Sequence, residues 1–190
     1  MIRIAVLGDI GSGKSFFAKQ FKIPLFSADE VVQSLYSKSR SLYNKFKKVF
    51  PKNFQKFPIN KFELINIINK NPENLKKIIK IVHPLVRKEM KLFLIKNKNK
   101  EAIVLDIPLF LENKLNLDTD ILVFIDADQK KILPRLKKRK NFNKKIYSLL
   151  KSLQMPIHIK RDQADFVVKN NFNSAKMKKE AKILINKIVI

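Results

Sequence analysis

The sequence contains no cysteine, and its 190 residues include only two histidines, His83 and His158. The absence of cysteine excludes disulfide frameworks, thiol catalysis and cysteine-ligated metals. Two histidines are also too few for a metal site built from several imidazoles. We therefore expect any metal to be Mg²⁺ held by oxygen ligands.

Long apolar runs are missing as well. No run approaches the roughly 18–20 residues of a membrane span, and the apolar start of the chain ends at Leu7, too early for the core of a signal peptide. We therefore expect a cytoplasmic protein with no membrane partner. A chain of 190 residues can form one substantial core, so we expect a single domain, with room for an inserted subdomain.

Acidic residues are scarce, with 16 Asp and Glu against 41 Lys and Arg, which gives a formal net charge of +25. Such a charge attracts nucleic acids without sequence preference. The lysines, however, are spread along the whole chain and mixed with Asn and Ile, which indicates a bias in composition rather than a binding patch. We expect no specific nucleic-acid partner.

The most informative segment is residues 8–15, which read G-x-x-x-x-G-K-S directly after the apolar run 2–7. Glycines let the backbone curl so that its N–H groups face a phosphate, and the start of the next helix completes the cradle. Lys14 would reach the β- and γ-phosphates, and the Ser15 hydroxyl would coordinate Mg²⁺. The expected nucleotide-binding residues are Gly8, Asp9, Ile10, Gly11, Ser12, Gly13, Lys14, Ser15 and Phe16.

Two carboxylates follow predicted strands. Asp29 closes the short apolar segment 23–28, and Asp106 closes the apolar run 102–105. Open α/β sheets bind ligands at the carboxyl ends of their strands, so both acids are candidates for the crevice of the phosphate loop. Asp106 would help to hold the metal. For Asp29, a place in the first turn of a helix explains the residue equally well.

Residues 38–100 carry little strand signal and repeat apolar residues at helical spacing. Pro51 is expected to end one helix, and Pro84 to begin another. His83 would cap that second helix or bind a substrate, and Arg87 could grip a phosphate. The aromatic residues of the region are expected in a helical core: Tyr43, Phe46, Phe50, Phe54, Phe57 and Phe62.

The second half of the chain predicts two more strands, over residues 121–125 and 165–169. A helix over residues 128–139 would place Arg135 and Arg139 on one face, either to clamp a phosphate or simply to face solvent. The segment 174–190 predicts an amphipathic helix whose inner face is formed by Ala181, Ile183, Leu184 and Ile188.

Together these separated motifs resemble the dephospho-coenzyme A kinases over nearly the whole chain. A phosphate loop alone indicates only a nucleotide, whereas His-Pro-x-Val-Arg combined with Asp-x-Pro-Leu is far more specific. The resemblance is carried by residues 8–15, 27–29, 83–87 and 106–112, by Arg135 and Arg139, and by Gln154, Lys160, Ala164, Asp165 and Asn170.

The resemblance implies an α/β fold, namely a P-loop kinase core with a parallel β-sheet flanked by helices. It adds a helical substrate-binding insertion at about residues 31–98 and a helical lid at about residues 136–160. The implied activity is transfer of the γ-phosphoryl group of ATP, with Mg²⁺, to the ribose 3′-hydroxyl of dephospho-coenzyme A, the last step of coenzyme A synthesis. The implied partners are ATP and dephospho-coenzyme A, and we expect a monomer or a weak homo-oligomer.

The resemblance also implies roles for single residues. Asp29 would take or orient the proton of the 3′-hydroxyl, while Lys14, Arg135 and Arg139 would stabilise the transferring group. Asn170 would join the ATP-binding residues, and Ser15 and Asp106 would hold the metal. The implied substrate-binding residues are Asp29, His83, Arg87, Pro108 and Leu109.

Three positions depart from the pattern of the family. Asp9 stands where members commonly have glycine, so an acid near the phosphates must point away or pair with a cation. Leu150, with Lys151 beside it, replaces an arginine one helical turn before Gln154. Lys61 replaces another arginine, and lysine cannot form the bidentate guanidinium fork.

Two other functions stay open on the sequence. One is a kinase for a different small hydroxyl substrate, since P-loop kinases share their phosphate machinery. The other is a degenerate nucleotide-binding or nucleic-acid-associated protein, whose affinity for nucleic acid would fall steeply with salt.

Overall fold

The computed structural model describes residues 1–139 and 142–189. The chain divides into two compact units, which are described separately. The first consists of Met1–Ser27, Lys96–Asn143 and Leu150–Ile190, and the second of Ala28–Ile95 and Lys144–Leu149. Among the described residues, no helix is both long and apolar enough to cross a membrane.

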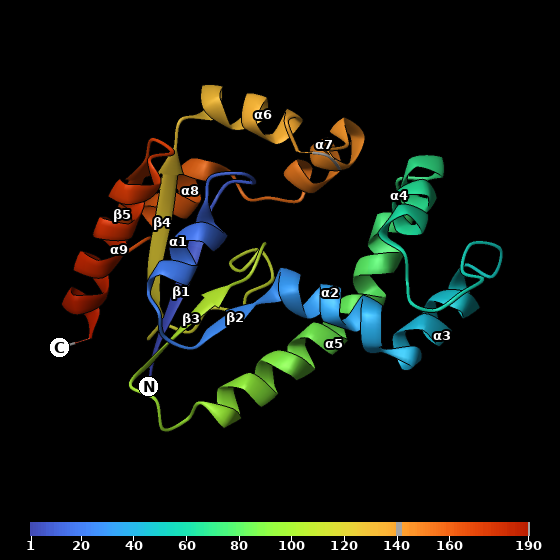
Figure 1. Ribbon diagram of the computed structural model, residues 1–190, viewed down its shortest axis with the longest axis horizontal. Helices are drawn as coiled ribbons and strands as arrows, with labels where there is room; N and C mark the ends of the chain where they lie inside the picture. The colour runs from blue at the N-terminus through green and yellow to red at the C-terminus, as the bar shows by residue number, and fades with distance from the viewer. Residues whose placement is uncertain (140–141, 190) are drawn as a thin grey trace. The chain divides into compact units, whose positions relative to one another are not determined.

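The first unit is built on a five-stranded parallel sheet with the strand order β2-β3-β1-β4-β5 (Figure 1). The central strand β1 (Ile2–Gly8) lies between β3 (Ala102–Asp106) and β4 (Ile121–Ala127). The edge strands are β2 (Leu25–Ser27) and β5 (Phe166–Asn170). The strands expected near residues 2–7, 102–105, 121–125 and 165–169 are confirmed, with β4 continuing two residues beyond its apolar run.

The apolar runs are continuous because both faces of the central strands are covered. On one face, Ile4 and Val6 pack with Phe17 of α1 (Lys14–Gln20) and Ala181 of α9 (Ser174–Ile188). Alternation turns Ala5 and Leu7 to the other face, where they are also buried. The short helix α8 (Ile157–Asp162) contacts β1 and β4.

The C-terminal helix α9 follows the expected pattern with one exception. Met177, Ala181 and Leu184 are buried at helical spacing, whereas Ile183 is 53% exposed. The expectation for Ile183 is wrong because this residue falls off the stripe that these three side chains define.

Helix α6 (Gln129–Lys137) begins at the Asp128 cap, whose carboxylate accepts the Lys130 N–H at 2.9 Å. The helix ends before Arg139, so the expectation that Arg135 and Arg139 share one helical face is wrong. A longer helix would bring further like charges of the basic run 137–140 onto adjacent turns, which is unfavourable. Instead, the Arg139 N–H bonds to the Leu136 carbonyl at 3.0 Å.

The second unit is built from helices joined by turns and loops, with no strand among its described residues. It contains α2 (Ala28–Lys38), α3 (Arg40–Val49), α4 (Lys61–Lys70), α5 (Asn74–Lys96) and the first six residues of α7 (Lys144–Ser152). As Pro51 predicts, α3 ends just before it. The core of this unit includes the fully buried, stacked pair Phe46 and Phe54, whose ring centroids lie 5.2 Å apart.

The aromatic residues of this unit mostly occupy the core, as expected: Tyr43, Phe46, Phe50 and Phe54 are buried, and Phe57 packs against them. The expectation is wrong for Phe62, which is 61% exposed. The capping box formed by Asn60 and Glu63 fixes the start of α4, and Leu64 and Ile67 then define its buried face. Phe62 points away from that face.

The expected helix start at Pro84 is also wrong, because Pro84 lies inside the 23-residue helix α5. A proline in a helix interior removes one backbone hydrogen bond and costs about 3 kcal/mol. Before it, Ile78 and Val82 pack into the core of the second unit, and after it Leu85 and Val86 do the same. Burial on both sides of the proline offsets that cost and keeps the helix continuous.

Candidate active site

The loop between β1 and α1 holds all three glycines of the chain. Gly8, Gly11 and Gly13 have φ values of 144°, 82° and 96°, in the region that disfavours side chains. A Cβ atom on Gly13 would lie 2.5 Å from Nδ2 of Asn170. No side chain caps α1, which begins at Lys14, so a bound anion can take that position. The loop has the backbone shape that phosphate binding requires.

Two polar side chains hold this loop together. The Lys14 ammonium donates to the carbonyl oxygen of Asp9 at 2.8 Å, so the lysine lies along the loop itself. Asn170, at the end of β5 and only 6% exposed, donates through Nδ2 to the Ser12 carbonyl at 2.7 Å. Its Oδ1 accepts the Phe172 N–H, also at 2.7 Å. Asn170 is therefore fixed against the backbone of the loop.

Asp9 is the acidic departure at the second position of the loop, and its side chain is buried. Oδ1 accepts the Ile10 N–H at 2.7 Å, and Oδ2 forms an ion pair with the ammonium of Lys151 in the last turn of α7. The acid thus pairs with a cation. Sequence reasoning did not select Lys151 as a site residue, although it stands beside Leu150, where the resemblance leads one to expect an arginine.

A cavity of about 530 Å³ opens beside the loop. Two of its lining residues form a cation–π pair, in which the Arg135 guanidinium lies over the Phe172 ring, 4.3 Å from the ring centre. Buried Leu136 and Met177 supply apolar surface. The residues of the first unit that line it are Gly11, Gly13, Phe16, Arg135, Leu136, Lys138, Arg139, Asn170, Phe172, Asn173, Ser174 and Met177. An anionic ligand with a flat ring fits this combination of basic, aromatic and apolar groups.

The candidate metal ligands lie on neighbouring elements of the first unit. Asp106, buried at 3% exposure, ends β3 opposite Ser27 of β2, and β3 is the neighbour of β1. Ser15 lies in the first turn of α1. Within residues 1–139 and 142–189, no three His, Asp or Glu side chains gather into a metal site. A Mg²⁺ ion at Ser15 and Asp106 would therefore complete its shell with phosphate and water oxygens.

The segment after β3 is tied to the end of the expected lid by Glu112. Its Oε1 accepts the Met155 N–H at 2.8 Å and pairs with the Lys160 ammonium at 2.5 Å. Lys160 is 4% exposed, so this ion pair lies inside the unit. Nearby along the chain, Pro108 is exposed and Leu109 has a positive φ of 58°.

Three further candidate residues belong to the second unit. Asp29 is exposed in the first turn of α2, which begins directly after β2. His83 is half-buried on α5, and Arg87 is exposed one turn further along the same helix. Burial, and secondarily the Arg87 charge, lower the pKa of His83 and so favour its neutral imidazole.

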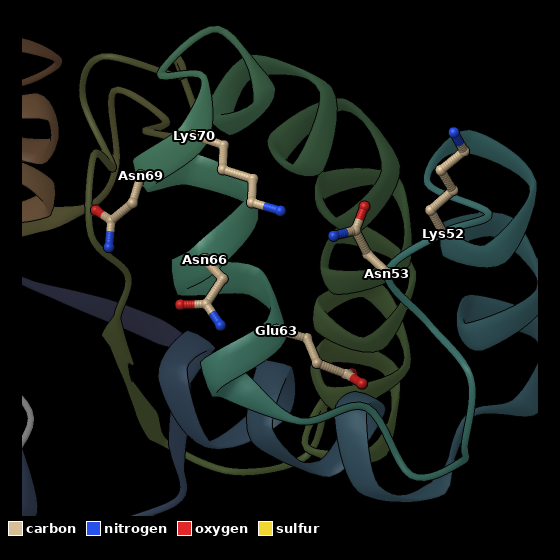
Figure 2. A pocket seen from close by; sticks show the side chains of 6 residues that line it. All are labelled: Lys52, Asn53, Glu63, Asn66, Asn69 and Lys70. Atoms are coloured by element: carbon tan, nitrogen blue, oxygen red, sulfur yellow. The ribbon is translucent and has the colours of Figure 1, made fainter.

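The second unit also has a polar pocket of about 400 Å³, formed by α4 and the segment after α3 (Figure 2). Its lining is Lys52, Asn53, Glu63, Asn66, Asn69 and Lys70. None of these residues was expected to be functional, and Glu63 already serves the capping box of α4.

Comparisons with known proteins agree on one family. A family model described as dephospho-CoA kinase matches residues 2–176. The dephospho-CoA kinase of Wolbachia sp. subsp. Brugia malayi (strain TRS) is 32% identical over 97% of both chains, and that of Bartonella quintana (strain Toulouse) is 34% identical over 87% of both.

Solved structures show the same fold. A Thermus thermophilus protein, TT1252, matches with a TM-score of 0.75 and 24% identity, and the dephospho-CoA kinase from Campylobacter jejuni with 0.68 and 23%. Each match covers 98% of this chain and 97% of the other. The α/β fold with a parallel sheet flanked by helices is confirmed.

Proposed function

This chain belongs to the dephospho-CoA kinase family, and from that premise we propose how its residues divide the work of phosphoryl transfer. The reaction moves the γ-phosphoryl group of ATP to the ribose 3′-hydroxyl of dephospho-CoA. The observation that carries the assignment is the phosphate loop, with three glycines at positive φ and Lys14 at the start of α1. Phosphoryl transfer depends chiefly on positioning and on neutralising charge, and this loop serves both.

ATP is the ligand that suits the loop together with the adjoining cavity. Its base and ribose fit beside the Arg135 and Phe172 pair, and its phosphates fit the amides of residues 8–15. Lys14 then exchanges the neutral carbonyl oxygen of Asp9 for anionic phosphate oxygens, a stronger partner for an ammonium. Asn170 supports ATP binding indirectly, because it holds the Ser12 carbonyl.

The hydroxyl of Ser15 and the carboxylate of Asp106 are oxygen donors, the class that Mg²⁺ prefers, so these residues fit the metal. When bound, Mg²⁺ neutralises charge on the phosphates. Asp106 would supply the negative charge that holds the ion, and the Ser15 hydroxyl would be a second oxygen ligand. Arg135 and Arg139 add positive charge along the cavity, where both side chains form part of the lining.

On the acceptor side, Asp29 orients the 3′-hydroxyl and takes its proton. Neutral His83 and the Arg87 guanidinium bind dephospho-CoA by hydrogen bonds and charge, with Pro108 and Leu109 as further substrate contacts. We assign substrate binding to helices within about residues 31–98 and the lid to about residues 136–160.

A coupled assay of ADP release tests this assignment, with dephospho-CoA added last. Wild-type protein should release ADP only after that addition. Asp29→Asn should lower kcat by about 10²–10⁴-fold while ATP affinity stays within about twofold, and Lys14→Ala should weaken ATP binding as well.

Glu30→Gln, which removes the neighbouring exposed acid, serves as the matched control and should retain activity. Folded wild-type protein that releases no ADP in response to dephospho-CoA would overturn the proposed reaction. Full kcat in Asp29→Asn would overturn only the role of Asp29.

A further inference from the structure

We propose that Lys151 is a positioning residue for the phosphate loop, which acts by neutralising the buried carboxylate of Asp9. In this proposal the loop can accept ATP phosphates only while Asp9 carries a paired cation. The proposal rests on the proposed function in one respect, that ATP is the anion which the loop binds. Lys151 reaches the loop from 142 positions away in the sequence.

Asp9 is bonded through both its side chain and its backbone. The side-chain oxygens take the Ile10 N–H at 2.7 Å and the Lys151 ammonium. The backbone oxygen of Asp9 takes the Lys14 ammonium at 2.8 Å and the Ser12 N–H at 3.1 Å. A shift of this one residue would therefore displace the lysine that reaches the phosphates and two amides of the loop.

The negative charge of the buried Asp9 carboxylate makes the contact with Lys151 necessary. The Asp9 side chain is 2% exposed, so water screens it poorly, and a buried carboxylate without a cation is strongly unfavourable. A bare carboxylate in the loop would also repel the phosphates that the loop has to bind, because both are anionic. The ammonium of Lys151 cancels this charge, while its own side chain remains 35% exposed.

A second explanation of the same geometry is that Lys151 binds ATP phosphates directly. The two explanations differ in their dependence on Asp9. If Lys151 acts by neutralising Asp9, removing the charge of Asp9 makes Lys151 dispensable. If Lys151 contacts the nucleotide itself, its loss weakens ATP binding by the same factor whether or not Asp9 is charged.

A double-mutant cycle separates the two explanations. Asp9→Asn removes the charge but keeps an oxygen for the Ile10 N–H, and Lys151→Met keeps the length of the side chain without the ammonium. The four proteins of the cycle are titrated calorimetrically with Mg-ATP in the absence of dephospho-CoA. Lys182→Ala removes the same charge from an exposed position on α9 and serves as the control.

We expect Lys151→Met to weaken ATP binding about tenfold or more, since an uncompensated charge acts on the phosphates at low effective dielectric. The Asp9→Asn/Lys151→Met double variant should bind ATP within about threefold of Asp9→Asn alone. Lys151→Arg should restore binding, and Lys182→Ala should leave it unchanged. In the steady state, Lys151→Met should raise the KM for ATP far more than it changes kcat or the KM for dephospho-CoA.

The proposal is overturned if Lys151→Met binds ATP as tightly as wild type, or if the same loss appears in the Asp9→Asn background. The double variant keeps the test decisive should Lys151→Met fail to fold, because it contains no buried carboxylate at position 9. ATP binding is measured without the acceptor, so protein that binds ATP but releases no ADP refutes the kinase assignment and leaves this cycle informative.

Discussion

Gly13→Ala tests the architecture of the phosphate loop most directly. Gly13 has a φ of 96°, and a Cβ atom there would lie 2.5 Å from Nδ2 of Asn170. A side-chain amide can often move aside, but this one is 6% exposed and makes two hydrogen bonds of 2.7 Å, to the Ser12 carbonyl and from the Phe172 N–H. The substituted loop must therefore distort its backbone or break bonds that are buried.

The cost has two parts. Holding alanine at this positive φ costs about 1–2 kcal/mol. Displacing the Asn170 amide leaves buried polar groups without partners, which costs about 1–3 kcal/mol. The sum is about 2–5 kcal/mol, less than the stability of a typical domain, so the variant should fold but with a distorted loop.

Urea denaturation measures this loss of stability, and calorimetric titration with Mg-ATP measures the effect on the loop. In an Asn170→Ala background the obstructing amide is absent, so Gly13→Ala should cost only the backbone part, about 1–2 kcal/mol. A loss below about 1 kcal/mol in the wild-type background, or an equal loss in both backgrounds, would refute the reasoning.

Two predictions concern other charged groups. The buried carboxylate of Asp120 bonds two nitrogens of the Arg3 guanidinium, each at 2.9 Å, and Asp120→Ala leaves this guanidinium, only 13% exposed, without its anion. We expect urea denaturation to show a loss of about 3–5 kcal/mol, against about 0.5 kcal/mol for the exposed control Asp118→Ala. The pKa of His83 should lie below 6.5 by NMR titration and rise in Arg87→Ala, with the chain's second histidine as reference. Because the unfolded chain then binds more protons, protonation at His83 should lower the free energy of unfolding as the pH falls below about 6.5. At higher pH this group should not change the free energy of unfolding. A His83 pKa at or above 6.5 would contradict this.

Helix boundaries show where local rules stop being sufficient. Pro84 is a sound signal for the first turn of a helix, yet α5 passes through it because side chains on both sides are buried in the same core. Arg139 has the right spacing from Arg135 to share a helical face, yet α6 ends at Lys137. Burial on both sides of Pro84 outweighs the local signal in α5, whereas α6 ends where the run of like charges at 137–140 makes a longer helix unfavourable.

In the candidate site, some features follow from the local sequence, and others depend on contacts between residues far apart in the chain. The spacing of Gly8, Gly13 and Lys14 was sufficient to predict the phosphate loop, because the loop is built from eight consecutive residues whose backbone shape depends on residue type. The partners of that loop were not predictable from spacing. Asn170 was predicted as an ATP-binding residue, but its hydrogen bond to the Ser12 carbonyl was not predicted. Lys151 carried no signal except its position beside Leu150.

By itself, the sequence determined the elements and the chemistry: apolar runs that form buried parallel strands, a glycine loop that curls around an anion, and the motifs that point to the family. Periodicity and backbone preference act over a few residues, so they can be recognised along the chain. The tertiary structure decided which distant side chains meet. The order β2-β3-β1-β4-β5 brings the end of β5 to the loop after β1 across β4, and packing within the first unit brings Lys151 to Asp9. Such contacts depend on the three-dimensional path of the whole chain, because each partner's local sequence is compatible with many other positions.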